Sequence, residues 1–151
     1  MPRMLSPNFY LDEFTFSQTA ARLGIDNAPD ARILKNLQRL AASLEQVRGT
    51  LGNLPILISS GYRSATLNRA IGGAPNSAHM DGLAVDFTCP RFGSVLATAR
   101  AVAKSNILFD QVILEYGRWV RLGIAEDTEV ARGELLSIGS DQAFVPGLRV
   151  V

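Results

Sequence analysis

One histidine and one aspartate, seven residues apart, stand in a segment that could carry chemistry. His79 lies in a loop after Ser77, Gly82 allows a sharp bend, and Asp86 falls within the alternating pattern of a strand. Such a path can bring an imidazole and a carboxylate to one point, and that pair of ligands is common at Zn²⁺ sites. By spacing alone, a simpler interpretation is the more common one: His79 is hydrogen-bonded in a loop and Asp86 caps a turn.

The composition limits the class of site to which this pair could belong. The chain has 151 residues, one His, one Cys and a formal net charge of +1. A single His excludes sites built from two or more histidines, and a single Cys excludes an internal disulfide framework or a cysteine-rich zinc module. A nearly neutral charge argues against a nucleic-acid partner. Charged or polar residues interrupt every apolar run, so we expect no membrane span.

The length and the N-terminus predict how the chain is organised. A chain of this size suits one compact domain, 1–151, in which residues 1–25 form a docking arm and a short helix. The N-terminal segment lacks the apolar region and the small-residue cleavage site of a secretory signal. We therefore expect the protein to be made in the cytoplasm without a signal peptide.

Periodicity predicts the elements that must position the pair. Apolar residues from Ile33 to Val47 recur at helical spacing and predict one long amphipathic helix. The run 55–60 predicts a buried strand, and the tail from residue 130 predicts one strand with an irregular end. The mixture predicts an α+β domain with helices packed on a mostly antiparallel sheet. Further helices are expected at 17–23, through 67–70 and at 93–104, and further strands at 83–88, 110–115 and 119–124.

Four motifs lie around the pair: Ser60-Gly61-Tyr62-Arg63-Ser64, Ile71-Gly72-Gly73, Ser77-x-His79-x-x-Gly82-x-Ala84-x-Asp86-Phe87 and Phe109-Asp110-Gln111. Together they resemble the M15 zinc peptidases, D-Ala-D-Ala carboxypeptidases and L-alanyl-D-glutamate endopeptidases that cut peptidoglycan stem peptides. The similarity is greatest to the short single-domain branch of phages and prophages. The resemblance implies a Hedgehog/DD-peptidase-like fold, a Zn²⁺ cofactor and a peptidoglycan substrate.

The resemblance also implies roles for individual residues. His79 and Asp86 match two of the family's three zinc ligands. Arg63 matches the arginine that holds the substrate carbonyl or the developing oxyanion, and Ser77 matches a substrate-contacting serine. Glu115 is a candidate for the general base.

Two aromatic residues beside these positions have two interpretations. Tyr62 and Trp119 could stack on a substrate, but an aromatic residue next to a strand is more often part of the core.

The chain departs from the family at the third ligand. The family's last ligand is the His of a Trp-Val-His strand, and the matching segment here reads Trp119-Val120-Arg121. A guanidinium stays protonated and has no lone pair for a metal, whereas catalytic zinc normally has three protein ligands. Two unit charges ~4 Å apart interact by about 4 kcal/mol at an effective dielectric of ~20, and a divalent ion doubles this. We predict that Arg121 forms a bidentate ion pair with Asp86 in place of the metal.

Two functions are compatible with this departure. In the first, hydrolysis is lost or impaired and the domain is kept as a cell-wall-binding or virion component, with peptidoglycan stem peptides or phage structural proteins as partners. In the second, an active zinc peptidase takes its third ligand from Glu115, water or a neighbouring chain, since Cys89 should face away. The ligand count favours the first.

Two further considerations bear on this choice. A serine hydrolase using His79 is disfavoured because the chain has no G-x-S-x-G elbow. The missing secretory signal fits a virion protein or one released at lysis.

Overall fold

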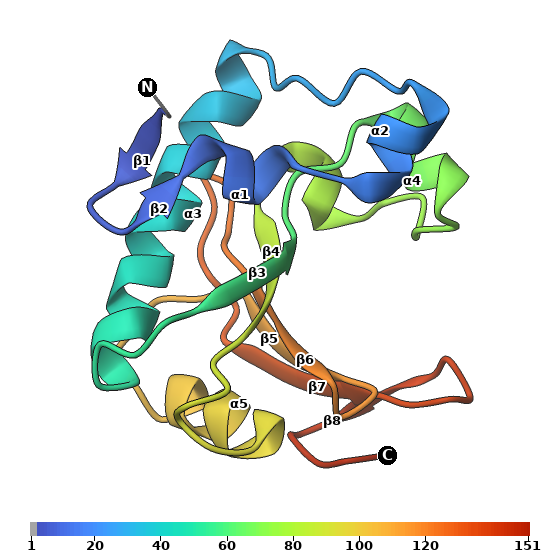
Figure 1. Ribbon diagram of the computed structural model, residues 1–151. Helices are drawn as coiled ribbons and strands as arrows, with labels where there is room; N and C mark the ends of the chain where they lie inside the picture. The colour runs from blue at the N-terminus through green and yellow to red at the C-terminus, as the bar shows by residue number, and fades with distance from the viewer. Residues whose placement is uncertain (1–2) are drawn as a thin grey trace.

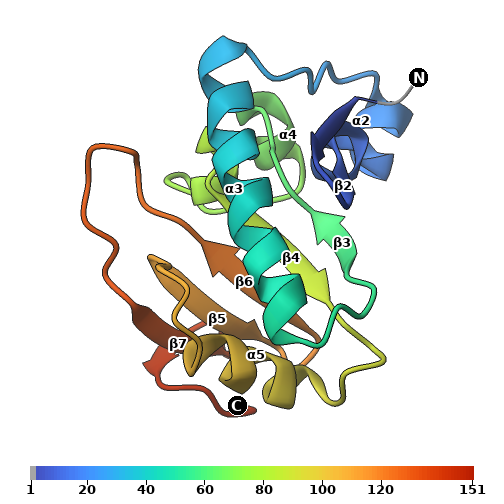
Figure 2. The same ribbon diagram turned by 90° about the vertical axis from the view of Figure 1, so that its left-hand side faces the viewer.

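A six-stranded sheet runs through the computed structural model, which describes residues 3–151, and the helices α3 and α5 cover one of its faces (Figures 1 and 2). The strand order is β3-β4-β6-β5-β7-β8. All neighbouring pairs are antiparallel except β5 and β7, which are parallel. The predicted α+β class with a mostly antiparallel sheet is therefore confirmed. The strands are β3 (Leu57–Ser60), β4 (Ala84–Thr88), β5 (Gln111–Glu115), β6 (Trp119–Gly123), β7 (Glu134–Ile138) and β8 (Phe144–Pro146).

The long helix α3 (Ala31–Thr50) provides most of the packing on the covered face. It begins where the Asp30 side chain accepts a hydrogen bond from the Ile33 amide, an arrangement that satisfies one free helix-end donor. Leu37, Leu40 and Leu44 on its buried stripe are fully excluded from solvent, and each such side chain contributes roughly 1.5–3 kcal/mol of transfer free energy. Within residues 3–151 no helix has the length and apolarity needed to cross a membrane.

The same face of the sheet meets a second helix, α5 (Val95–Ala103). Val85 and Phe87 of β4 and Val120 and Leu122 of β6 point into this core and are fully buried. Because side chains alternate along a strand, Asp86 and Arg121 must then point to the opposite, open face of the sheet. Two short helical segments, α4 (Ala65–Ala70) and the 3₁₀ turn η1 (Ala78–Asp81), lie on the chain between β3 and β4.

The N-terminal segment packs against α3, β3 and α4. It comprises β1 (Met4–Ser6), β2 (Phe9–Tyr10), α1 (Leu11–Thr15) and α2 (Gln18–Leu23). Phe9 and Phe14 are buried in the core, whereas Phe16 is 68% exposed. The division of the chain into one domain with a docking arm over 1–25 stays a prediction, and residues 1–2 lie outside the described residues.

Two sequence predictions about strands need correction. The run 55–60 does not form a buried strand: β3 is the edge strand, and Leu57 is 57% exposed. Ile56, just before it, lies in the core, and Ile58 is only partly buried against it. The tail forms two strands instead of one, because β7 pairs in parallel with β5 and β8 folds back on β7. Local periodicity could not reveal this arrangement, since a parallel pair is made between segments distant in the chain.

A carboxylate on α3 fixes the N-terminal hairpin. The Glu45 carboxylate accepts hydrogen bonds from the Ser6 hydroxyl (2.6 Å) and from the backbone and side-chain nitrogens of Asn8 (2.7 and 2.8 Å). Burial by itself would raise the pKa of Glu45, but these hydrogen bonds outweigh it and the pKa lies below its usual value. The ionised form of Glu45 is therefore the one that stabilises the fold.

We expect Glu45→Gln to lower the free energy of unfolding by about 1 kcal/mol at pH 7, because an amide NH₂ would oppose one of these donors. The pKa of Glu45 is lower in the folded state than in the unfolded state. The stabilisation is therefore full above the unfolded-state pKa of roughly 4.3 and is lost as the pH falls through the pKa of the folded state. Urea unfolding at pH 7 and pH 3 measures the difference. Glu129→Gln, at an exposed site, is the control. A loss that is the same at both pH values would contradict the assignment of this stabilisation to the ionised carboxylate of Glu45.

Candidate functional site

His79 is held in one orientation by its own turn. The Ser77 hydroxyl accepts a hydrogen bond from the His79 amide, and Gly82 ends the 3₁₀ turn in the left-handed conformation (φ 69°). The ring is fully buried, and its Nδ1 lies 2.7 Å from the carbonyl oxygen of Gly61. A carbonyl only accepts, so Nδ1 carries the proton in the neutral ring and Nε2 is left with a lone pair.

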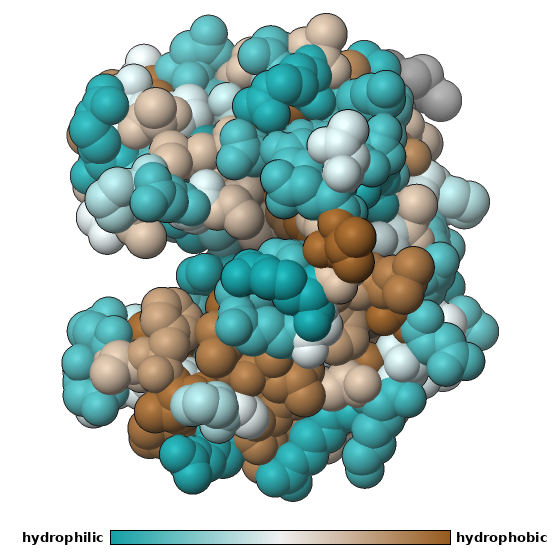
Figure 3. Space-filling model, turned by 180° about the vertical axis from the view of Figure 1, so that it is seen from behind, coloured by the Kyte–Doolittle hydropathy of each residue, from teal (hydrophilic) through white to brown (hydrophobic). Residues whose placement is uncertain are grey.

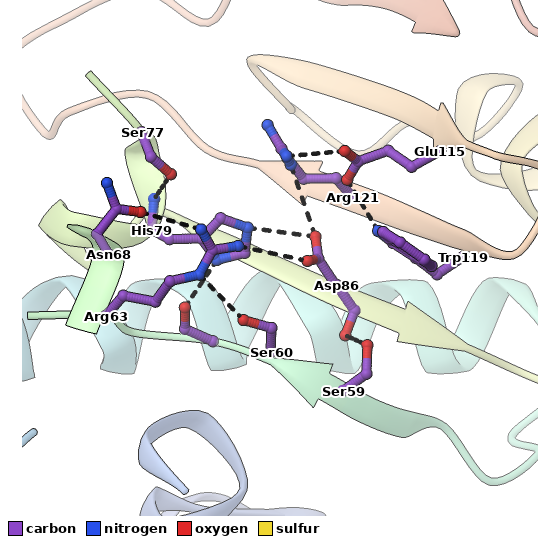
Figure 4. A network of polar contacts seen from close by, with 11 residues as sticks. Ser59, Ser60, Arg63, Asn68, Ser77, His79, Asp86, Glu115, Trp119 and Arg121 are labelled. Carbon is purple, nitrogen blue, oxygen red and sulfur yellow. Dashed lines mark hydrogen bonds and ion pairs between the residues drawn. The ribbon is translucent and has the colours of Figure 1, made fainter. Parts of the chain in front are cut away.

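Asp86 lies at the centre of the site (Figure 4). Its carboxylate is almost completely buried; Oδ1 is 3.2 Å from His79 Nε2, and Oδ2 is 3.8 Å from a terminal nitrogen of Arg63. Directly across the β4–β6 pair stands Arg121, whose Nε is 3.6 Å from Oδ1. The structure therefore brings His79, Asp86, Arg63 and Arg121 together on the open face of the sheet.

Arg121 makes its close contact with Glu115, not with Asp86. Its Nη2 donates to Glu115 Oε1 at 2.8 Å, and Trp119 Nε1 donates to the other carboxylate oxygen at 2.9 Å. The predicted bidentate pair with Asp86 is therefore wrong. Asp86 stands directly opposite Arg121, whereas Glu115 is the diagonal neighbour of Arg121 on β5. Because the arginine side chain is long and lies along the sheet, its terminal nitrogens meet the diagonal carboxylate.

The buried carboxyl of Glu115 is shifted toward its neutral form. Burial raises the pKa of Glu115, and the nearby charge of Asp86 acts in the same direction, while Arg121 and the Trp119 hydrogen bond oppose the shift. Arg121 thus stands between two buried carboxylates that would otherwise repel each other.

Arg63 is held by the loop motifs around it. It donates from Nη1 to Asn68 Oδ1 at 3.1 Å and from Nε to Ser60 Oγ at 3.3 Å, and its amide donates to the His79 carbonyl. A Cβ at Gly73 would overlap the Asn68 side chain and approach Arg63. Gly73 is therefore required for the close approach of this loop. Burial lowers the pKa of Arg63, and the Asp86 charge raises it.

The Ser-Gly-Tyr-Arg motif also touches the N-terminal segment. The Tyr62 amide donates to the Phe14 carbonyl at 2.6 Å. A Cβ at Gly61 would overlap that same carbonyl group. Tyr62 itself packs against the core and lines the cavity beside Arg63. Its stacking on a substrate stays a prediction.

The polar atoms at the centre do not form the ligand set of a catalytic zinc. His79 Nε2, Asp86 Oδ1 and Arg121 Nε are buried and lack a hydrogen-bond partner among residues 3–151. The first two carry lone pairs, but the third is an N–H donor on a cation. In the described part of the chain, no three His, Cys, Asp or Glu side chains gather closely enough to hold a metal ion. Cys89 is buried in the apolar core on the other face.

A groove crosses the centre. Two cavities, of about 550 and 580 Å³, both include Arg63, Ile71, Asp86 and Trp119 in their walls. They therefore form one continuous groove that passes over the Asp86 carboxylate. From behind, Figure 3 shows a deep notch on the left between the upper and lower halves of the molecule. The first cavity extends toward Phe16, and the second extends past Ser77 and Arg121 toward the turn between β7 and β8.

Three parts of this site were not predicted from the sequence. Asn68 was not identified as the partner of Arg63. The hydrogen bond from Trp119 to Glu115 was not predicted either. The hairpin residues Gln142 and Phe144, which line the groove, belong to a segment whose strands were not resolved by periodicity. No local signal could have found them.

The fold is an α+β domain with a buried polar centre on one face of its sheet, and its sequence places it in a known family. The family model described as Peptidase M15 matches residues 7–122. The chain belongs to that family. The Zinc D-Ala-D-Ala carboxypeptidase of Streptomyces albus G is 39% identical to it over 70 residues, which are 46% of this chain and 26% of that protein. The match thus spans about a quarter of that relative's length.

We expect Arg121→Met to lower the free energy of unfolding by about 2–3 kcal/mol at pH 7. Removal of one partner leaves buried carboxylates unpaired, at a cost of roughly 3–5 kcal/mol for full burial, and Arg121 is 22% exposed. Urea unfolding measures the loss. Arg118→Met, at an exposed turn position, is the matched control and should stay within about 0.5 kcal/mol of the unmodified protein. Equal losses for the two variants would contradict this account.

Proposed function

We propose that this M15 peptidase-like protein binds peptidoglycan stem peptides in its groove, and that zinc-dependent hydrolysis is lost or strongly impaired. The observation that carries the proposal is the guanidinium of Arg121, 3.6 Å from Asp86 Oδ1 and bonded to Glu115. A fixed cation at that distance repels Zn²⁺ and supplies no lone pair. His79 and Asp86 are then two ligands without a third.

The state of Glu115 supports the same proposal. Both of its carboxylate oxygens accept hydrogen bonds, one from Arg121 and one from Trp119. A general base must take up a proton, and the positive charge of Arg121 opposes protonation of this carboxylate by lowering the pKa of Glu115. In this arrangement Glu115 acts as the counter-ion of Arg121 instead of as the base.

A second candidate function is an active zinc peptidase with Glu115 as its third ligand. It is favoured by the position of Arg121 between Glu115 and Asp86. It requires Arg121 to rotate out of the centre and Glu115 to move toward His79 and Asp86, because these three side chains do not form a metal-sized group in the structure. Such a rotation breaks an ion pair in a largely buried setting, which is costly. The first proposal therefore fits the contacts better.

The ligand class and the biological setting rest on different support. The matched relative is named for action on D-Ala-D-Ala, and this supports a stem peptide as the ligand. A role in a phage or prophage, as a virion component or as a protein released at lysis, rests on the resemblance to short single-domain members alone. Phage structural proteins are the alternative partners under that role.

We expect the unmodified protein to bind zinc weakly, and Arg121→His to tighten zinc binding by about 100-fold or more. The substitution adds an imidazole and removes a repulsion, and even 3 kcal/mol corresponds to about that factor. Calorimetric titration with zinc and elemental analysis of the purified proteins measure this. Stoichiometric zinc in the unmodified protein, together with cleavage of stem peptides, would support the second candidate function and overturn the first.

Two controls separate a restored site from adventitious binding. Arg118→His adds a histidine at an exposed turn and should leave zinc affinity unchanged. The double substitution R121H with His79→Ala should lose the gained affinity, because it removes a ligand from the fully buried side of the site.

We expect the unmodified protein to cosediment with purified peptidoglycan, and Ile71→Asp to reduce the bound fraction about tenfold. Ile71 lines both halves of the groove and is 45% exposed, so a charge there obstructs the groove with little cost to the core. Leu108→Asp, at a residue that is 83% exposed and lines a separate cavity, should bind as the unmodified protein does. A peptide ending in D-Ala-D-Ala should compete. Equal loss in both variants would contradict binding through the groove.

A further inference from the structure

We propose that the β7–β8 hairpin forms the wall of the groove that selects ligand residues by size, with Phe144 as the side chain in contact with the ligand. This inference rests on the proposed function and identifies the residue that would set its specificity. The family match ends at residue 122, so the wall lies beyond the matched segment and is identified from the structure of this chain.

The wall faces the loop that follows α4 across the second cavity. Ile138, Gln142 and Phe144 line one side of this cavity, and Gly72 and Gly73 line the other. In Figure 1 the hairpin (red) extends on the same side of the molecule as α4. Phe144 is 51% exposed, so much of its ring is free to meet a ligand.

The wall is anchored on both sides of the turn. Ser137 Oγ donates to the Gly147 carbonyl at 2.7 Å and accepts from the Arg149 amide at 3.0 Å. The Tyr116 hydroxyl donates to Gln142 Oε1 at 3.0 Å. A wall fixed in this way can discriminate by shape, because contacts on a rigid element need little further ordering on binding.

The chemistry of the two sides defines the ligand residue. The glycines opposite carry no side chains, so the space between the walls is left for the side chain of the ligand. Ile138 and Phe144 are apolar, and the charged groups of the centre lie deeper, at Arg121 and Glu115. The side-chain oxygen of Gln142 already accepts a hydrogen bond from Tyr116. The NH₂ group of the same side chain is the donor available to a ligand carbonyl. The apolar side chains favour an apolar ligand residue at this point, and the name of the matched relative, a D-Ala-D-Ala carboxypeptidase, supports alanine as that residue.

The chain's single tryptophan provides a direct measure of binding. Trp119 lines both halves of the groove, so its fluorescence should respond when either half is filled. The experiment titrates the unmodified protein, Phe144→Ala and Phe92→Ala with two synthetic tripeptides, one ending in D-Ala-D-Ala and one ending in D-Ala-D-Leu. Phe92 is 36% exposed and lies after β4, away from the groove.

We expect the unmodified protein to prefer the alanine peptide. Phe144→Ala should weaken that complex about fivefold to tenfold, as truncation of a contacting aromatic does, and should reduce the preference over the bulkier peptide. Phe144→Leu should restore most of both properties, and Phe92→Ala should change neither. A change in preference is a result that a general loss of stability would not produce.

Two outcomes would overturn the inference, and they are distinguishable. If the unmodified protein binds the peptides and Phe144→Ala behaves as Phe92→Ala does, the hairpin is not the selecting wall, while the proposed function stands. If the unmodified protein binds neither peptide nor purified peptidoglycan, the proposed function fails and this inference fails with it.

Discussion

The cation of Arg121 between two buried carboxylates is the interaction on which the centre of this protein depends. Asp86 and Glu115 come from different strands and face the same space, so without a cation between them their negative charges would repel each other. The similar D-Ala-D-Ala carboxypeptidase of Streptomyces albus G is named as a zinc enzyme. This chain has a guanidinium that donates to Glu115 and lies within ion-pair distance of Asp86.

The sheet and one loop together make this arrangement possible. β4, β6 and β5 are neighbours, so Asp86, Arg121 and Glu115 share the open face while their sequence neighbours fill the core. The loop after β3 supplies Arg63, and the carbonyl of Gly61 fixes the His79 ring. Each polar side chain is therefore positioned by an element whose other side is buried, which gives the site the rigidity of the core.

The groove joins parts of the chain that are far apart in sequence. Phe16 lies at the first half, Phe144 lies at the second, and the motif residues form the floor between them. This continuity is what makes a peptide a suitable ligand, because an extended chain can cross the charged centre while its neighbouring residues occupy both halves. Loss of metal chemistry at the centre would leave this binding surface in place.

The fold class, the long helix and the family can be predicted from the amino-acid order, because amphipathic periodicity and the spacing of a compact motif are local properties of the chain. The absence of a metal-ligating side chain at position 121 is equally visible there. The hydrogen bond from Arg121 to Glu115 and the place of the tail beside the groove emerge only in the folded chain. Both depend on register and on pairing between distant strands, which residue types and spacing along one chain do not specify.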